Sequence, residues 1–472
     1  MDLTSLTIAG ARKALDAKEY SALELTNEYL DTIRKKDGEL HAYLEVWEKE
    51  AREDAKMADL RIARGEARTL TGIPIALKDN ILVEGRIASA ASKMLENYRA
   101  SYDATVVRKL KDEGAVFLGR TNMDEFALGA STEHSAFGPT KNPYDTSRVP
   151  GGTSGGSTAA VAANLSLACL GSDTGGSIRQ PSALCGVVGL KPTYGAVSRY
   201  GLIAAASSLD QIGTIGKRVA DARAVFDVIR GHDEKDSTSL PDSFYKGIPK
   251  RNILGVPRGF LKEGVDADVL AEFEKTLDSL KEKGYSIVDV EVPSFHYALA
   301  VYYIINPAEV STNLARFDGI RYGLSMQAED ISGVYAKTRG EGFGPEVRRR
   351  ILIGTFVLSS GYADAYYRKA RAVRELIRGD FARAFDSVDA IVLPTSPTPA
   401  FKFGEKSDPL AMYAADIFTV PVNLAGVPAI SVPSGNVKRD GATLPVGFQI
   451  IASHGGENTI FAIGEDVEIP SA

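Results

Sequence analysis

Residues 171–186 read GSDTGGSIRQPSALCG, and residues 150–158, a short distance before them, read PGGTSGGST. Both stretches carry hydroxyl side chains on glycine-rich backbone, a combination that suggests a nucleophile beside an oxyanion site. Ser177 is the strongest candidate nucleophile, because it follows two glycines and precedes a predicted short helix, IRQPSAL. No histidine lies between His134 and His232, however. Another group must therefore take the proton from Ser177.

The glycines before Ser177 predict an oxyanion hole that is made of main chain alone. A residue at a helix N-terminus sees unpaired N–H groups and the positive end of the helix dipole. Without a bulky side chain at the centre, consecutive N–H groups can point at one oxygen. The predicted donors are the N–H groups of Thr174, Gly175, Gly176 and Ser177.

A lysine is the best candidate for the missing base. Burial can lower the pKa of a lysine by several units, and the neutral amine can then deprotonate a serine. Lys78 ends the apolar stretch GIPIALKDN, residues 72–80, which predicts a buried strand. Lys191, in GLKPT, is the second candidate. A lysine at a strand end can also carry its ammonium to the surface, so this alternative stays open for Lys78.

Other catalytic motifs fail on their context. GTSGG, residues 152–156, fits the nucleophile elbow G-x-S-x-G with Ser154 as nucleophile, but that motif needs a strand directly before it. The preceding NPYDTSRVP contains two prolines, so it is not a central strand. SFYK, residues 243–246, fits S-x-x-K but lacks the accompanying SDN and KTG. The sequence has no phosphate-binding loop and no H-E-x-x-H, and we expect no metal site.

The pattern around these stretches predicts an α/β fold. An apolar strand at 72–80, a helix at 103–114 and a strand at 115–122 alternate as in a sheet with crossover helices. TAAVAANLSLACL predicts a buried helix that runs into a further strand. Other strands are predicted at 186–195, 251–256, 286–292, 389–393, 428–433 and 445–451. We expect one large central mixed sheet that is covered by helices on both faces.

Two parts of the chain are expected to form one compact unit. Residues 1–66 are predicted to be a helical segment, and residues 67–472 an α/β domain. The helical segment contains SALELTNEYLDTIRKKDG, in which Ser21 begins a capping box and Gly38 is predicted to end the helix. The polar stretch 232–250, with two prolines, predicts an excursion from the domain.

The composition is that of an ordinary globular protein, and we expect it in the cytoplasm. Apolar residues make up 44% and charged residues 25% of the chain, and no apolar run is long enough to predict a membrane-spanning helix. Two cysteines, Cys169 and Cys185, do not make a disulfide framework or a zinc cluster and fit a reducing compartment. A net charge of −6 argues against nucleic-acid binding by this chain alone.

The two glycine-rich stretches, with GIPIALKDN before them and GVVGLKPTYG after them, resemble the amidase signature family. This resemblance covers most of the chain and implies the amidase-signature fold and an amide-cleaving triad of Ser, cis-Ser and Lys. It makes Ser177 the acyl-forming nucleophile and Lys78 the base. The middle hydroxyl falls on Thr153, where the family has a serine preceded by a cis peptide bond. Ser154 is implied as a supporting hydroxyl, or as the relay in place of Thr153.

Four further stretches resemble one branch of that family, the glutaminase subunits of tRNA-dependent amidotransferases. They are SRYGLIAAASSLDQIGTIGK, NLARFDGIRYG, RRRILIGTFVLSSGYADAYYRKA and DIFTVPVNLAGVPAISVPSG. The resemblance implies a chain that hydrolyses glutamine in a heterotrimer with amidotransferase subunits B and C. The first of these partners would bind the misacylated tRNA, use ATP and Mg²⁺, and amidate glutamyl-tRNA(Gln), aspartyl-tRNA(Asn) or both with the ammonia. The chain itself would carry no cofactor and touch no membrane.

The same resemblance assigns residues to glutamine. Arg350, in RRRILIGT, is implied to hold the α-carboxylate, for which an arginine fork is well suited. Asp416, in DIFTVPVN, is implied to face the α-ammonium, or the amide and its ammonia. Tyr302 or Tyr303, in VYYI, is implied to line the site. Two other functions stay open: a stand-alone amidase for small or aryl amides, and a non-catalytic scaffold whose glycine loops are structural.

Overall fold

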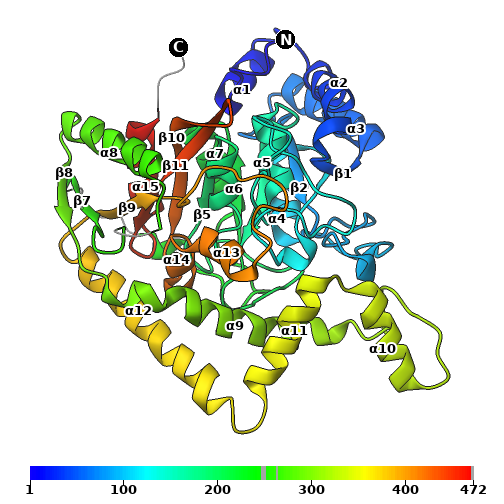
Figure 1. The fold of residues 1–472 in the computed structure, drawn as a ribbon. Helices are drawn as coiled ribbons and strands as arrows, with labels where there is room; N and C mark the ends of the chain where they lie inside the picture. The colour runs from blue at the N-terminus through cyan, green and yellow to red at the C-terminus, as the bar shows by residue number, and fades with distance from the viewer. Residues whose placement is uncertain (246–250, 262–263, 469–472) are drawn as a thin grey trace.

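A single mixed sheet runs through the molecule (Figure 1). The structure, a computed structural model, describes residues 1–245, 251–261 and 264–468. In that part of the chain the sheet has eleven strands in the order β1-β3-β2-β4-β6-β5-β10-β11-β9-β7-β8. Pairing is parallel around β2 and around β7 and antiparallel elsewhere. The predicted α/β class with one large mixed sheet is therefore confirmed.

Every strand that the sequence predicts is present, and two more join them. The strands are β1 (Tyr43–Val46), β2 (Pro74–Lys78), β3 (Val116–Thr121), β4 (Ala168–Asp173), β5 (Val188–Lys191), β6 (Gln211–Gly216), β7 (Ile253–Val256), β8 (Ser286–Asp289), β9 (Ala390–Pro394), β10 (Ala429–Arg439) and β11 (Ala442–Ala452). β1 and β6 were not predicted from the sequence. β6 reads QIGTIG, and its glycines weaken the strand signal. A Cβ at Gly213 would lie 2.1 Å from the Leu190 carbonyl oxygen of neighbouring β5, so this close approach requires glycine.

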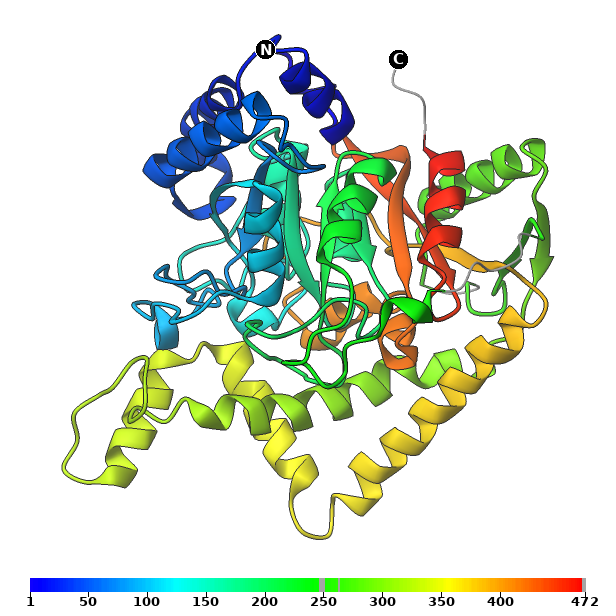
Figure 2. The ribbon, with the colours of Figure 1, turned by 180° about the vertical axis from the view of Figure 1, so that it is seen from behind.

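Helices cover both faces of this sheet (Figures 1 and 2). α5 and α6 lie on the face seen in Figure 1, whereas α4, α7 and α15 lie on the face seen in Figure 2. The α-helices of the described residues are α1 (Ile8–Asp16), α2 (Ala22–Leu40), α3 (Glu48–Ala63), α4 (Thr105–Glu113), α5 (Gly155–Ala162), α6 (Arg179–Leu184), α7 (Val219–Ile229), α8 (Ala267–Glu282), α9 (Ala298–Asn313), α10 (Ile331–Gly342), α11 (Pro345–Leu358), α12 (Lys369–Phe385), α13 (Pro409–Tyr413), α14 (Val420–Ala425) and α15 (Glu457–Val467). None of them has both the length and the apolar character that crossing a bilayer requires.

The N-terminal helices begin largely as predicted. Ser21 accepts a hydrogen bond from the N–H of Glu24, and the Glu24 carboxylate accepts from the Ser21 N–H, so the capping box is present. α2 continues past Gly38 to Leu40, however, where His41 takes the left-handed conformation that ends the helix. The predicted end at Gly38 was wrong because the helix interior tolerates a glycine that packs against nothing.

The polar stretch after α7 returns to the domain. Within residues 232–245, the Leu240 N–H donates to the Gly195 carbonyl at 2.8 Å, and the Asp233 N–H donates to Ser239 Oγ at 2.9 Å. The remainder of the predicted excursion, residues 246–250, lies outside the described residues.

A set of longer helices lies beyond one end of the strands, below the sheet in Figures 1 and 2. α9 runs across this end and packs against α11 and α12. α11 and α12 form a V whose apex points away from the sheet. α1 lies at the opposite end of the molecule in both views.

Candidate active site

Lys78 ends β2, between β3 and β4, and its side chain is completely buried. Burial lowers the pKa of Lys78 to about 7, although the carboxylates of Asp124, Asp173 and Asp210 oppose the shift. A substantial share of the amine is therefore neutral near pH 7, which is the form that a base needs.

Two hydroxyls of the first glycine-rich stretch face this amine. Lys78 Nζ lies 2.7 Å from Thr153 Oγ1 and 2.9 Å from Ser154 Oγ. Its third contact, at 3.2 Å, is the carbonyl oxygen of Ser172 at the end of β4. The peptide bond between Gly152 and Thr153 is cis. The structure thus brings both candidate relay hydroxyls to the candidate base.

Hydrogen bonding distinguishes the two hydroxyls. Ser154 Oγ donates to the Ser172 carbonyl at 3.1 Å, so its proton is already committed. A neutral amine has two N–H donors and one lone pair. It can donate to Ser154 and to the Ser172 carbonyl and accept a proton from Thr153, which is the nearest of the three. Thr153 is therefore the hydroxyl nearest to the amine, and among the described residues it donates to no other acceptor.

Ser177 lies in the loop between β4 and α6, two residues before α6 begins at Arg179. Its side chain is almost completely buried. The Ser154 N–H donates to the Ser177 carbonyl at 3.0 Å, so main chain ties the two stretches together. Ser154 begins α5 rather than following a strand, and the nucleophile-elbow interpretation fails in the structure as it does in the sequence.

One of the four predicted oxyanion donors is occupied. The Gly176 N–H donates to Asp173 Oδ1 at 2.9 Å, so it does not point into the site, and its assignment to the oxyanion hole is corrected. Within the described residues, the N–H groups of Thr174, Gly175 and Ser177 make no hydrogen bond. Gly176 is still required, because its φ is +136° and a Cβ there would lie 2.2 Å from Thr419 Oγ1.

An ion pair that was not predicted from the sequence anchors the Ser177 loop. Asp173 and Arg179 are both fully buried and joined by two hydrogen bonds of 3.0 Å. Burial by itself would raise the pKa of Asp173, but the charge and hydrogen bonds of Arg179 outweigh it and lower this pKa to about 2. Arg179 also donates to Asn423 at 2.5 Å and Gln449 at 2.6 Å. The sequence signal for this ion pair was the presence of an Asp and an Arg on either side of the glycines in SDTGGSIR.

Arg350 lies on the buried face of α11 and borders a cavity of about 190 Å³. Its Nε donates to Glu346 at 2.7 Å and its Nη1 to Asn306 at 2.9 Å. Its guanidinium also lies 4.8 Å and 5.0 Å from the ring centroids of Tyr303 and Tyr413. Two of its nitrogens are thus fixed by neighbours, which leaves Nη2 for a ligand.

The two candidate tyrosines lie at different places. Tyr302 packs against the Ser177 loop, because a Cβ at Gly175 would lie 2.7 Å from its hydroxyl oxygen. Tyr303 stacks on Tyr413, with ring centroids 3.8 Å apart, and so belongs to the surroundings of Arg350. Tyr302 is therefore the tyrosine beside the Ser177 loop, and Tyr303 the one beside Arg350.

Asp416 is buried close to Arg350 and to the Ser177 loop. Burial raises the pKa of Asp416 well above its ordinary range; the charge of Asp173 adds to this shift and that of Arg350 opposes it. Its carboxylate makes no hydrogen bond to any described residue, whereas its carbonyl accepts from Thr419 Oγ1 at 3.1 Å. Thr419 Oγ1 also donates to the Gly175 carbonyl at 2.6 Å. A carboxylate without a partner beside the oxyanion loop can bind an ammonium group.

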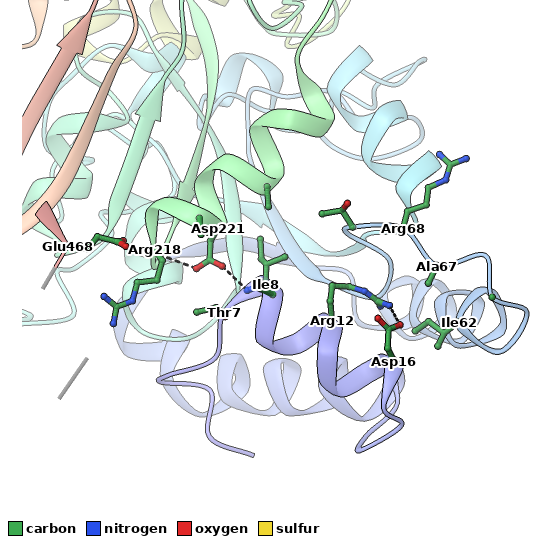
Figure 3. A pocket seen from close by; sticks show the side chains of 15 residues that line it. Thr7, Ile8, Arg12, Asp16, Ile62, Ala67, Arg68, Arg218, Asp221 and Glu468 are labelled. Carbon is green, nitrogen blue, oxygen red and sulfur yellow. Dashed lines mark hydrogen bonds and ion pairs between the residues drawn. The ribbon is translucent and has the colours of Figure 1, made fainter. Parts of the chain in front are cut away.

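A larger cavity, of about 830 Å³, lies away from this site (Figure 3). It is bordered by α1, the end of α3 and the start of α7. Asp221 accepts hydrogen bonds from the N–H groups of Ile8 and Arg218 there, and Arg12 faces Asp16. The side chains of Arg68 and Arg218 point in different directions, so the cavity offers no converging set of catalytic groups.

Comparison with a family model places residues 24–461 in the family described as amidase. Two similar relatives are the A subunits of the glutamyl-tRNA(Gln) amidotransferases of Thermoanaerobacter pseudethanolicus and Carboxydothermus hydrogenoformans. The first is 54% identical over 98% of this chain and 96% of its own. The second is 51% identical over 99% of this chain and 98% of its own.

Solved structures show the same likeness. The crystal structure of the glutamyl-tRNA(Gln) amidotransferase A subunit of Thermotoga maritima matches with a TM-score of 0.81 and 43% identity. That match covers 100% of this chain and 96% of the other. A native peptide amidase from Stenotrophomonas maltophilia matches with a TM-score of 0.82 but only 29% identity, over 99% and 97% of the two chains.

Proposed function

Because the chain belongs to the amidase family, we propose that it is the glutaminase subunit of a tRNA-dependent amidotransferase. One observation carries the chemistry: the amine of Lys78 lies 2.7 Å from Thr153, on the stretch that is tied to Ser177. The names of the relatives that are 50% identical or more support glutamine as the substrate and tRNA as the final acceptor, in preference to other amides.

The first half of the reaction forms an acyl enzyme. Ser177 Oγ attacks the side-chain amide carbon of glutamine while its proton passes to Thr153, and the Thr153 proton passes to Lys78. The amide oxygen gains the negative charge and is held by the free N–H groups of the loop, those of Thr174, Gly175 and Ser177. Protonated Lys78 then has three acceptors for its three N–H groups.

The second half releases ammonia and restores the enzyme. The proton on Lys78 returns through Thr153 to the leaving nitrogen, the C–N bond breaks, and ammonia departs. A water molecule then attacks the ester carbon and gives up a proton through Thr153 to Lys78. As the bond between the ester carbon and Ser177 Oγ breaks, this proton returns through Thr153 to Ser177 Oγ, and glutamate is released. A base with a pKa of about 7 can take and return this proton at neutral pH.

The polar groups around the loop suit the two ends of an amino acid. Nη2 of Arg350 and its stacked rings would hold the α-carboxylate of glutamine. The unpaired carboxylate of Asp416 would hold its α-ammonium, whose charge would in turn lower the pKa that burial has raised. Tyr302 would pack along the carbon chain between them.

The remaining steps would belong to partner subunits in the cytoplasm. We propose that subunits B and C complete the enzyme, and that the first of them binds the misacylated tRNA and uses ATP and Mg²⁺. This chain supplies ammonia to that partner and carries no cofactor of its own. The relatives are themselves named as subunits, which supports an assembly of this kind.

The test is glutamine hydrolysis by Ser177→Ala in the complex with subunits B and C. We expect activity to fall to background, a loss of about 10⁶-fold, as for other serine nucleophiles. Glutamine analogues that acylate serine should label the native chain and leave the variant unlabelled. Near-normal turnover by Ser177→Ala would contradict the proposal. Hydrolysis of simple amides in the absence of any glutaminase activity would favour a stand-alone amidase.

A further inference from the structure

Glu125 is a buried carboxylate that the proposed reaction does not use. It begins the short 3-10 helix η2 (Glu125–Ala127), directly after Asp124, and is 2% exposed. Burial raises the pKa of Glu125 to about 7, although hydrogen bonds from Ser92 and Gly344 oppose the shift. A carboxylate in such a place is costly unless its hydrogen bonds offset the loss of water. Its partners therefore show what it is there to hold.

The carboxylate of Glu125 holds the start of α11. Its Oε2 accepts a hydrogen bond at 2.8 Å from the N–H of Gly344, the N-cap residue of that helix, and its Oε1 accepts one at 2.5 Å from Ser92 Oγ. In a capping box, a Glu or Gln three residues into the helix accepts from the N-cap N–H. That position of α11 is Val347, which has no acceptor. Glu125 supplies the oxygen instead, from 219 residues earlier in the chain.

The contact between Glu125 and Gly344 is close. A Cβ at Gly344 would lie 2.4 Å from Glu125 Oε2, so a side chain there would displace the carboxylate. The φ of Gly344 is −69°, which any residue adopts, and the glycine is therefore required by this contact alone. The rings of Phe126 and Phe343, which follow Glu125 and precede Gly344, pack with centroids 5.7 Å apart. The start of α11 is thus fixed to η2 by polar and apolar contacts together.

The residue beside Glu125 holds the other wall of the Arg350 cavity. Asp124 Oδ1 accepts a hydrogen bond at 3.1 Å from the N–H of His134, which borders the same cavity of about 190 Å³ as Arg350. The N–H of Asp124 donates to the Thr153 carbonyl oxygen at 3.3 Å. Two adjacent residues therefore connect α11, which carries Arg350, to the stretch that carries Thr153.

We propose that Glu125 is a positioning residue for glutamine binding, which fixes the start of α11 so that Arg350 lies at the required distance from the Thr153 stretch. Glu125 acts through Arg350 and touches neither the substrate nor the reacting atoms. Gly344 and Arg350 are six residues apart, less than two helical turns, so a shift at the start of α11 reaches the guanidinium. The inference rests on the proposed function in one respect, namely that Arg350 binds the α-carboxylate of glutamine.

The experiment measures glutamine hydrolysis by variants of this chain in the complex with subunits B and C. Glu125→Ala removes the carboxylate, and Glu125→Gln keeps one acceptor oxygen. Glu457→Ala and Glu457→Gln are the matched controls, because Glu457 is also 2% exposed and accepts a main-chain N–H at 2.8 Å from a distant segment, that of Thr193. Gel filtration and thermal unfolding of each complex show whether the variants assemble and fold.

We expect Glu125→Ala to raise KM for glutamine about tenfold and to leave kcat within about twofold, because misplacing a binding group costs affinity before it costs chemistry. Glu125→Gln should recover most of this loss, and both Glu457 variants should keep the native KM. An unchanged KM in Glu125→Ala would overturn the inference, and so would a fall in kcat without a rise in KM.

Gly344→Ala tests the same contact from the side of α11. Its added Cβ should displace the carboxylate and raise KM about threefold, again without a change in kcat. If Glu125→Ala does not assemble, this variant decides, and a native KM in Gly344→Ala would then overturn the inference.

The route through Arg350 is tested in an Arg350→Met background. There Glu125→Ala should lower kcat/KM for glutamine no further, since the group that it positions has been removed. A further loss of about tenfold in the double variant would show that Glu125 acts by another route and would overturn the inference.

The native complex separates this inference from the proposed function. If the native complex hydrolyses glutamine and Glu125→Ala keeps the native KM, only the inference is wrong. If the native complex hydrolyses simple amides but not glutamine, the proposed function is wrong, and the inference falls with it because Arg350 then has no α-carboxylate to bind.

Discussion

Two buried lysines end two strands of the same sheet, Lys78 on β2 and Lys191 on β5. Burial is the largest cause in both cases, and it lowers each pKa to about 7. What differs is the contact that each amine makes. Lys78 Nζ meets the hydroxyls of Thr153 and Ser154, whereas Lys191 Nζ donates to the carbonyl oxygen of Pro192 at 2.8 Å.

The comparison shows that a low pKa does not by itself identify a base. A neutral lysine takes up a proton only from a group that can give one, and a carbonyl oxygen has no proton to give. Lys191 also feels the positive charge of Arg179, which helps to keep it neutral without any role in proton transfer. The hydroxyl partner, and not the burial, therefore separates the candidate catalytic lysine from a structural one.

The strongest test of this difference replaces each lysine by methionine, whose side chain has a similar volume but no amine. Lys78→Met should lower kcat/KM for glutamine by about 10²- to 10⁴-fold, the range for loss of a general base. Lys191→Met should change kcat/KM by no more than about threefold, because it removes a single hydrogen bond to main chain. Steady-state kinetics of both variants would test this. An equally large loss with Lys191→Met would refute the assignment.

The next variants test the hydroxyls that distinguish Lys78. Thr153→Ala should lower kcat by about 100-fold, because it removes the route between Ser177 and Lys78. Ser154→Ala should cost about fivefold, since Lys78 keeps two of its three contacts. Thr153→Ser, which restores the hydroxyl, should recover most of the activity. A larger loss with Ser154→Ala than with Thr153→Ala would transfer the relay to Ser154.

The pH dependence gives a third test. Lys78 must be neutral to act as a base, and its pKa of about 7 lies below the ordinary value for lysine. The rate of acylation should therefore fall about tenfold per pH unit below pH 7 and level off above it. The same profile should remain in Lys191→Met, although Lys191 has a similar pKa. A shifted acid limb in that variant would connect Lys191 to the chemistry.

The fold could be predicted from the sequence because its strands are local patterns, whereas the roles of Ser177, Thr153 and Lys78 stay predictions. Strands such as β2 and the first part of β10 are short runs of mostly apolar residues, and the glycine-rich stretches are visible in the sequence. The strand β6 was not predicted because its glycines are required by the close approach of β5. That strand is a neighbour of β6 in the folded sheet, and the sequence does not show this. Local order also made Gly176 look like an oxyanion donor, whereas folding turns its N–H toward Asp173.

The partners of each group depend on contacts between distant segments. Arg179 meets Asn423 and Gln449, more than 240 residues further along the chain, and no spacing in the sequence announces these contacts. Likewise, the sequence left Tyr302 and Tyr303 as equal candidates. One lies on the Ser177 loop and the other on Arg350, because neighbouring residues of α9 point to different sides.

The smallest expected effect lies at the far end of the site, on Glu346. Its Oε1 accepts hydrogen bonds from Arg350 Nε at 2.7 Å and from the Tyr413 hydroxyl at 3.0 Å, so it orients the arginine without reaching the reacting bond. Glu346→Gln keeps an acceptor oxygen but removes the charge that strengthens the contact. We expect KM for glutamine to rise about three- to fivefold while kcat and its pH profile stay unchanged.

The control for this variant is Glu375→Gln on α12, where an exposed glutamate pairs with Arg378. It should leave KM unaltered, because exposed ion pairs contribute little. The two ends of the site should therefore respond differently: changes around Lys78 lower kcat, and changes around Arg350 raise KM. A fall in kcat with Glu346→Gln would mean that the arginine acts in the transition state as well, and that the separation between proton transfer and substrate binding is not real.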